Sequence, residues 1–369
     1  MLDKGRINSV QLLLLLFMME VSSAAIYAPA KISEAAGPDG WLSVSIPVFF
    51  YGLVIVGIAL ALAGRFPSKV FTEYLPEIMG KIPGKLLAAA YVLFFINISF
   101  GTLNEISSFV HIAFMSGTPL TVLDIIGAIV ALYGAYLGIE AIARENELIF
   151  PVWILIGTLV LALVAKDINF GNLRPVFENG MMPALKGSYV DSPWRGGAFI
   201  MFMLFPYLNQ KNEAFKAAFL QQAMNSVFAG VTMLVIVGVF GTSVTAHLVF
   251  PYNSLARYIS IGNFIERANI LVVVIWLFGA LVKLALLYHT AGIATASTLG
   301  LKQYRVTLIP IAVATVILSR VTQGTYLQLT TFIFGPWPIY AAIMELAVPA
   351  IILLVAMIRK KGTKAVAGQ

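Results

Sequence analysis

The sequence predicts an all-α integral membrane protein, and three observations support that class. Hydrophobic residues make up 60% of the 369 positions and charged residues only 11%, whereas soluble globular proteins carry about 45–50% apolar and about 25% charged residues. The chain contains ten apolar runs, and a transmembrane helix needs about 20 residues. Continuous runs such as residues 270–287 exclude a β-barrel, whose strands alternate between apolar and polar positions. The composition therefore excludes a soluble enzyme, a disordered protein and a nucleic-acid-binding protein.

The ten predicted transmembrane helices are apolar runs that end at charged or turn-forming residues. We expect them to form a single transmembrane domain over residues 1–369. They cover residues 9–36, 41–63, 86–115, 120–139, 148–165, 194–208, 219–246, 268–299, 306–321 and 337–358.

The distribution of basic residues predicts the orientation of the chain. Ten spans place both termini on the same side of the membrane. That side carries 15 of the 24 lysine and arginine residues, and the opposite side carries eight, Arg195 among them, with Lys283 inside a span. Loops rich in lysine and arginine remain in the cytoplasm, so we expect both termini to be cytoplasmic.

The two halves of the chain repeat the same features. Each half has an amphipathic segment between its second and third spans, at residues 65–85 and 247–267, which predicts a helix on the membrane surface. The first helix of each half also contains helix-breaking residues. These are Ser22-Ser23-Ala24-Ala25 before Pro29 in one half, and Gly196-Gly197 and Phe205-Pro206 in the other.

Five spans per half give the halves opposite orientations in the membrane. Inverted repeats with broken leading helices are typical of five-plus-five transporters. We therefore expect this inverted-repeat transporter fold, with repeats over residues 7–166 and 190–358 and with broken first and sixth helices. The alternative is that the breaks are ordinary proline kinks, which membrane helices tolerate.

Ionisable residues inside spans are candidates for function because lipid does not solvate charge. They are Glu20, Glu105, His111, Lys283, His289 and Glu345. In the third span a polar stripe lies on one helical face, bordered by Glu105. It faces either a wet interior or a neighbouring helix, to which it would hydrogen-bond. The stripe consists of Asn97, Gly101, Asn104, Ser108 and His111.

A buried lysine must either find a carboxylate or lose its charge. Lys283 is in the eighth span, and Glu20 in the first is a plausible partner. Five-plus-five transporters that are coupled to sodium bind a cation where these two helices adjoin, so the ammonium group could substitute for that ion. The alternative is a structural Lys–Glu pair.

The sequence contains no recognisable catalytic or cofactor-binding motif. Its three histidines are scattered and its cysteine count is zero, which leaves no expected metal site. It also lacks a glycine-rich phosphate loop with a lysine. We expect neither enzymatic activity nor a cofactor.

Several short motifs resemble the B subunit of the GerA-type spore germination receptors. These motifs are Phe-Pro-Tyr at 250–252, Ala-Arg-Tyr-Ile at 256–259, Phe-Ile-Glu-Arg at 264–267, Ile-Trp at 275–276 and Val-Lys at 282–283. This family of spore permeases belongs to the amino acid–polyamine–organocation superfamily, and the resemblance covers almost the whole chain. In the wider superfamily glycines flank the first-helix break, where this chain has Ser22-Ser23-Ala24-Ala25.

The resemblance implies a membrane subunit of the spore's inner membrane that senses a germinant such as an amino acid. Its partners would be the germinant, the receptor A and C subunits and membrane lipid, with no role for nucleic acid. The first alternative is a proton-coupled amino-acid transporter that uses Glu20, Glu105 or Lys283. The second is a structural subunit that only holds its partners.

We expect the ligand pocket between the first, third, sixth and eighth helices. Its ligand-binding residues would be Ser22, Ser23, Ala24, Tyr27, Asn97, Gly101, Asn104, Phe199, Met203, Leu204 and Phe205. The residues that would replace an ion or carry a proton are Lys283, Glu20 and Glu105.

Overall fold

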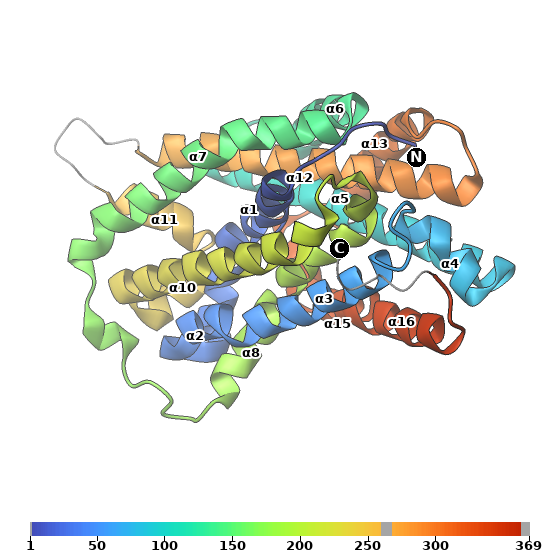
Figure 1. Ribbon diagram of the computed structural model, residues 1–369. Helices are drawn as coiled ribbons and strands as arrows, with labels where there is room; N and C mark the ends of the chain where they lie inside the picture. The colour runs from blue at the N-terminus through green and yellow to red at the C-terminus, as the bar shows by residue number, and fades with distance from the viewer. Residues whose placement is uncertain (1, 260–267, 363–369) are drawn as a thin grey trace.

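The computed structural model describes residues 2–259 and 268–362. Within these ranges the regular elements are helices, apart from one isolated bridge between Ile7 and Leu208. The long helices run roughly along one direction, with α6 and α7 on one side of the bundle, α15 and α16 on the opposite side and α1 between them (Figure 1). The expected all-α class is confirmed.

The first half contains seven α-helices and three short 3-10 helices. The α-helices are α1 (Ser9–Ala36), α2 (Gly40–Ser45), α3 (Pro47–Ala63), α4 (Phe71–Met79), α5 (Lys81–Ala113), α6 (Leu120–Leu137) and α7 (Ile139–Val164). The 3-10 helices are η1 (Gly37–Asp39), η2 (Ala165–Asp167) and η3 (Phe170–Leu173).

The second half begins with a segmented helix. Its elements are α8 (Met182–Arg195), η4 (Gly196–Ile200), α9 (Met201–Leu204) and η5 (Phe205–Tyr207). The remainder comprises η6 (Lys211–Glu213), α10 (Ala214–His247), α11 (Pro251–Tyr258), α12 (Ala268–Leu299), α13 (Arg305–Thr322), α14 (Tyr326–Phe334), α15 (Pro336–Ala342), the π-helical turn η8 (Ile343–Ala347) and α16 (Val348–Ile358).

Eight helices of the described chain are long and apolar enough to cross a membrane. The second expected span is α3, a shorter apolar helix of 17 residues. The sixth is the succession from α8 to η5, which begins at Met182 rather than at residue 194.

The first helix is continuous, so the expected break at residues 22–29 is wrong. α1 runs through these positions over 28 residues and contains Pro29. The Ser22 hydroxyl donates to the carbonyl of Met18 in the same helix, at 2.7 Å. Serine and alanine are tolerated in a helix, and Pro29 costs one backbone hydrogen bond and a ring clash that membrane helices accommodate. Because α1 is buried away from water, its backbone keeps the helical hydrogen bonds.

Where the break in the sixth helix is expected, the chain stays helical but changes from α to 3-10 hydrogen bonding. The backbone forms 3-10 turns at Gly196–Ile200 and again at Phe205–Tyr207, where Pro206 stands in the first turn. The structure therefore has one segmented helix, the sixth, and it packs on the continuous α1.

The expected amphipathic helix of the first half is confirmed as α4. Its buried face includes Phe71, Tyr74, Leu75 and Ile78, and it packs against α5 and α12. The counterpart in the second half is α11, which packs against α1 and α12. The part of the expected segment at residues 260–267, including Phe264 and its motif, lies outside the described residues.

α1 forms the centre of the bundle and packs against α7, α8, α10 and α12. Five consecutive side chains, Leu15 to Met19, are buried. A helix that is apolar and buried around its circumference belongs to the protein interior. Polar groups on α1 therefore face other helices and must find partners there.

The segment before α1 ties several helix ends together. Asp3 Oδ2 accepts from the backbone N–H of Ile139 at 3.0 Å and lies 2.8 Å from His289 Nε2. Arg6 donates to the carbonyl of Pro206 at 2.7 Å. These contacts join the starts of α1 and α7 to α12 and to the end of the interrupted sixth helix.

Candidate functional site

Lys283 on α12 points into the bundle towards α1. Its side chain is only 4% exposed, and Nζ donates to the hydroxyl of Ser23 at 2.8 Å. This confirms the expected direction of the side chain. The described carboxylates form no salt bridge with Lys283, and its charge interacts at longer range with Glu105, Glu345 and Glu20, in that order of strength.

Two buried carboxyl groups accompany Lys283. Glu105 on α5 is 6% exposed and Glu345 in the π-helical turn is 1% exposed. In each, the Oε2 atom has no hydrogen-bond partner among the described residues. Ser23 lies beside the Glu105 carboxyl group, so one hydroxyl stands between the ammonium group and this carboxylate.

These groups meet at a cavity between α5, α8, η4, α12 and the last span. The volume open to the centre of a water molecule is about 50 Å³, so the cavity admits water. Four of the expected residues line it: Asn97, Gly101, Glu105 and Lys283. The cavity is also lined by Glu345, which was expected as a candidate for function, and by four residues that no sequence feature indicated: Trp194, Gln323, Phe332 and Trp337.

Glu20 is held by a second polar cluster rather than by Lys283. Its two carboxylate oxygens accept from Gln222 Nε2 at 2.7 Å and from Asn225 Nδ2 at 2.6 Å. Arg195 Nη1 lies 3.7 Å from Glu20 Oε2, and both side chains are almost fully buried. The expected pair of Glu20 with Lys283 is therefore wrong. Glu20 lies beside Arg195 instead, because Arg195 is inside the bundle and not in a loop, as its place among the basic residues outside the spans implied.

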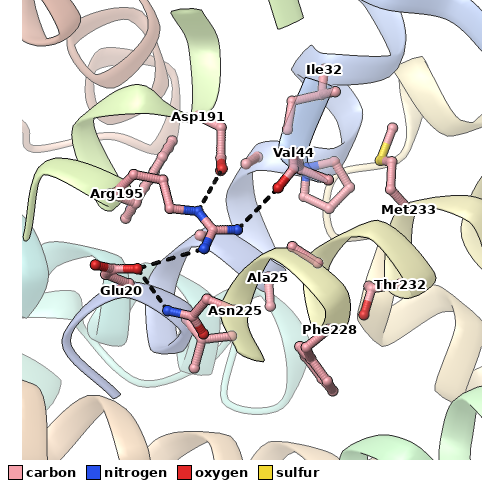
Figure 2. A pocket seen from close by; sticks show the side chains of 16 residues that line it. Glu20, Ala25, Ile32, Val44, Asp191, Arg195, Asn225, Phe228, Thr232 and Met233 are labelled. Atoms are coloured by element: carbon pink, nitrogen blue, oxygen red, sulfur yellow. Dashed lines mark hydrogen bonds and ion pairs between the residues drawn. The ribbon is translucent and has the colours of Figure 1, made fainter. Parts of the chain in front are cut away.

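Arg195 is fixed from three sides, as Figure 2 shows. Besides Glu20 it contacts Asp191 Oδ2 through Nε at 3.3 Å, and it donates to the carbonyl of Val44 at 3.2 Å. A second cavity adjoins this cluster and is lined mainly by apolar residues of α1, α8 and α10, including Ala24. Trp194 lines both cavities and separates them.

Two other expected residues serve helix packing. The Tyr27 hydroxyl donates to the backbone carbonyl of Glu105 at 2.7 Å, which fixes α1 against α5. Asn104 donates to the carbonyls of Ser319 and Gln323. The polar stripe of the third span therefore divides: Asn97 and Gly101 border the cavity, and Asn104 binds α13.

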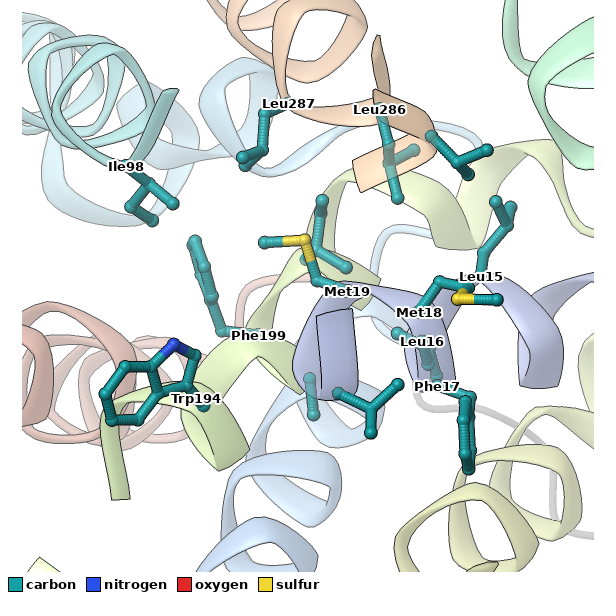
Figure 3. Packing of buried hydrophobic residues seen from close by; sticks show 14 of the residues in the cluster. Leu15, Leu16, Phe17, Met18, Met19, Ile98, Trp194, Phe199, Leu286 and Leu287 are labelled. Carbon is teal, nitrogen blue, oxygen red and sulfur yellow. The ribbon is translucent and has the colours of Figure 1, made fainter. Parts of the chain in front are cut away.

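The expected residues of the sixth helix are buried in the apolar core. The Phe199 ring stacks on Phe95 at 5.4 Å between centroids and lies close to Ile98 and Met19 (Figure 3). Met203, Leu204 and Phe205 are also buried. None of these four lines either of the two cavities described above.

The overall arrangement is similar to that of solved transporters. MhsT in complex with L-phenylalanine superposes with a TM-score of 0.66 at 14% identity, over 96% of this chain and 90% of that chain. Mhp1, a nucleobase-cation-symport-1 family transporter in a closed conformation, gives a TM-score of 0.67 at 16% identity, over 97% and 80%. At such low identity the likeness shows the fold alone, and it confirms the inverted-repeat transporter fold.

Sequence comparison identifies the family. The chain is 24% identical to spore germination protein KB of Bacillus subtilis (strain 168) over 98% of this chain and 97% of the relative. It is 26% identical to spore germination protein YndE of the same strain over 98% and 99%. The sequence model of the spore germination protein family matches residues 6–326. The chain therefore belongs to the spore germination protein family and is an integral membrane protein with a transporter fold.

Proposed function

We propose that the chain is the germinant-sensing membrane subunit of a spore nutrient receptor. It binds a small nutrient such as an amino acid in the cavity around Lys283. The observation that carries the proposal is the set of buried groups at this cavity: an ammonium group with one hydrogen bond and two carboxyl groups with unpartnered oxygens. Such groups are costly in a membrane interior unless they have a function.

The proposal includes partners, location and internal symmetry. The subunit acts with A and C subunits in the inner membrane of the spore, with both termini in the cytoplasm. Membership of the spore germination family and the excess of basic residues on one side support this assignment. The inverted repeats cover approximately residues 7–166 and 190–358.

Binding becomes a signal through a change in helix arrangement. A ligand shifts a conformational equilibrium only when it binds one state better than the other. The interrupted sixth helix supports this mechanism, because Trp194 and Gly197 at the break line the cavity. The cavity is small in this conformation, so occupation by a nutrient requires the helices around it to move.

A thermal-shift screen of the purified chain tests the proposal. Amino acids, sugars and nucleosides are compared, and a nutrient that binds the folded state raises the melting temperature. We expect at least one class to do so, and we expect Lys283→Met to abolish the shift. No shift with any class, together with normal germination of spores that lack the subunit, contradicts the proposal.

The second candidate is a proton-coupled secondary amino-acid transporter that uses Glu20, Glu105 or Lys283. The transporter fold and the unpartnered oxygen of Glu105 favour it. Uptake of a labelled amino acid into liposomes that contain only this chain would support it. Binding without uptake supports the receptor.

A further inference from the structure

The two polar clusters of the bundle contain more acidic than basic groups. Around the cavity, Glu105 and Glu345 face a single ammonium group, that of Lys283. Around Glu20, the carboxyl groups of Glu20 and Asp191 face a single guanidinium group. Each cluster of described residues therefore lacks one positive charge when its carboxyl groups are ionised.

The two clusters differ in how well their carboxyl groups are satisfied. In the Arg195 cluster, both Glu20 oxygens accept side-chain hydrogen bonds and Asp191 contacts the guanidinium. At the cavity, the hydroxyl of Ser23 accepts a hydrogen bond from Lys283 and lies beside the Glu105 carboxyl group. Glu345 is left as the carboxyl group without a cation of its own.

The structure around Glu345 keeps its carboxyl group at the cavity. A Cβ atom at position 196 would lie 1.6 Å from Glu345 Oε2, so this oxygen packs against Gly196 and a side chain at 196 would displace it. The carbonyl of the preceding residue, Met344, accepts a hydrogen bond from the Tyr91 hydroxyl at 2.7 Å. Single π-helical turns of this kind occur frequently at functional sites.

The walls of the cavity suit an organic cation. The rings of Trp194, Phe332 and Trp337 line it together with Glu345. Aromatic faces attract ammonium groups, whereas a hard metal cation requires a cage of oxygen ligands. The described residues contain no cluster of three or more side chains that could hold a metal ion.

We propose that this cavity selects a ligand of net charge +1, whose protonated amine binds the carboxylate of Glu345 beside the tryptophan rings. The inference rests on the proposed function of the cavity and names the ligand class. Lys283 stays with Ser23 and Glu105, so the ligand supplies the missing charge. A zwitterionic amino acid brings no net charge and binds less tightly than the corresponding amine.

Three small compounds that share a two-carbon unit test this selection. Ethylamine is L-alanine without its carboxylate, and propionate is L-alanine without its amine. The melting temperature of the purified chain is measured against the concentration of each compound at pH 7 and fixed ionic strength. We expect stabilisation in the order ethylamine, L-alanine, propionate, with no response to propionate.

Glu345→Gln removes the charge with little change in shape, and its unpartnered oxygen has no hydrogen bond to lose. We expect the apparent affinity for ethylamine to fall about tenfold or more, the usual consequence of losing a hydrogen bond to a charged group. Glu345→Asp keeps the charge and should retain the preference for ethylamine over L-alanine. Gly196→Ala, which displaces the carboxylate, should reproduce the loss even if Glu345→Gln does not fold.

The matched control is Glu140→Gln, which removes the same charge from a partly exposed pair with Arg144. We expect it to leave the ethylamine response unchanged. An equal response to ethylamine in wild type and in folded Glu345→Gln or Gly196→Ala overturns the inference, as does stronger binding of L-alanine or propionate. In those cases the proposed receptor function stands. It fails separately if no nutrient of any class shifts the melting temperature and spores that lack the subunit germinate normally.

Discussion

The ammonium nitrogen of Lys283 lies 2.8 Å from the hydroxyl oxygen of Ser23. This hydrogen bond joins the middle of α12 to the middle of α1, the helix around which the bundle packs. It holds the ammonium group at the cavity where two buried carboxyl groups, Glu105 and Glu345, lie. The same residue therefore contributes to the stability of the bundle and to the electrostatics of the cavity.

Lys283→Met should destabilise the protein, because it removes the one ammonium group near the buried carboxyl groups of Glu105 and Glu345. Removing one partner of a buried ionic group costs about 3–5 kcal/mol. The double variant Lys283→Met/Glu105→Gln should recover part of that loss, since one of the two uncompensated charges is gone. The melting temperatures of the wild type, both single variants and the double variant measure the coupling.

Additive effects in this cycle would contradict the assignment of Lys283 as the counter-charge of Glu105. The matched control is Lys216→Met, which makes the same chemical change on α10 near the end of the bundle. It should change the melting temperature much less.

Arg195→Gln should destabilise the protein to a similar extent. The change leaves Glu20 and Asp191 without their guanidinium, and both carboxyl groups are buried. We expect a loss of about 3–5 kcal/mol, partly relieved in the double variant Arg195→Gln/Glu20→Gln. A denaturation series in detergent checks this. An Arg195→Gln variant as stable as the wild type would show that the cluster contributes little to folding.

The contact between Asp3 and His289 should give a pH-dependent contribution to stability. Burial raises the pKa of Asp3, but the hydrogen bond and charge of His289 and the backbone N–H groups of Gly5 and Ile139 outweigh it, so that the pKa lies well below its usual range. A group with a depressed pKa stabilises the folded state above its unfolded pKa, about 4. That contribution is lost as the pH falls below this value.

Asp3→Asn should therefore lower the melting temperature at pH 7. The difference from the wild type should shrink as the pH falls from about 5 to the lowest value at which the protein stays folded. Glu34→Gln, in an exposed pair with Lys31, is the control and should show little difference at any pH. A difference for Asp3→Asn that stays constant with pH would contradict the linkage.

The parts of the fold set by burial could be predicted from the sequence. The apolar faces recur at helical spacing in α4, where Phe71, Tyr74, Leu75 and Ile78 are buried. The direction of Lys283 followed from the cost of exposing an ammonium group to lipid. Both predictions depend on large free energies of transfer between water and an apolar environment. These exceed the small differences between local backbone conformations.

The parts set by small energy differences could not be predicted. Ser22-Ser23-Ala24-Ala25 fit a helix or a break almost equally well, and packing of α1 on four neighbours made it continuous. Arginine residues of membrane proteins are found mainly in loops. Arg195 instead lies inside the bundle, because it pairs with Glu20 on α1 and with Asp191 one turn earlier on α8. No feature of the sequence predicts the π-helical turn that carries Glu345.

Gly101 offers the most direct test of the cavity as the germinant site. A Cβ atom added there meets no atom within 4 Å, and the residue lines the cavity. Gly101→Leu should fill the cavity without forcing the helices apart. Gly57→Leu is the matched control, because Gly57 also has open space around it and lies exposed on α3.

The decisive measurement compares germination and subunit abundance in the same spores for these two variants. We predict that Gly101→Leu abolishes the response to germinant while the abundance of the subunit stays at the wild-type level, and that Gly57→Leu changes neither. A normal germinant response in Gly101→Leu spores, or a parallel loss of response and abundance, would contradict a germinant site in this cavity.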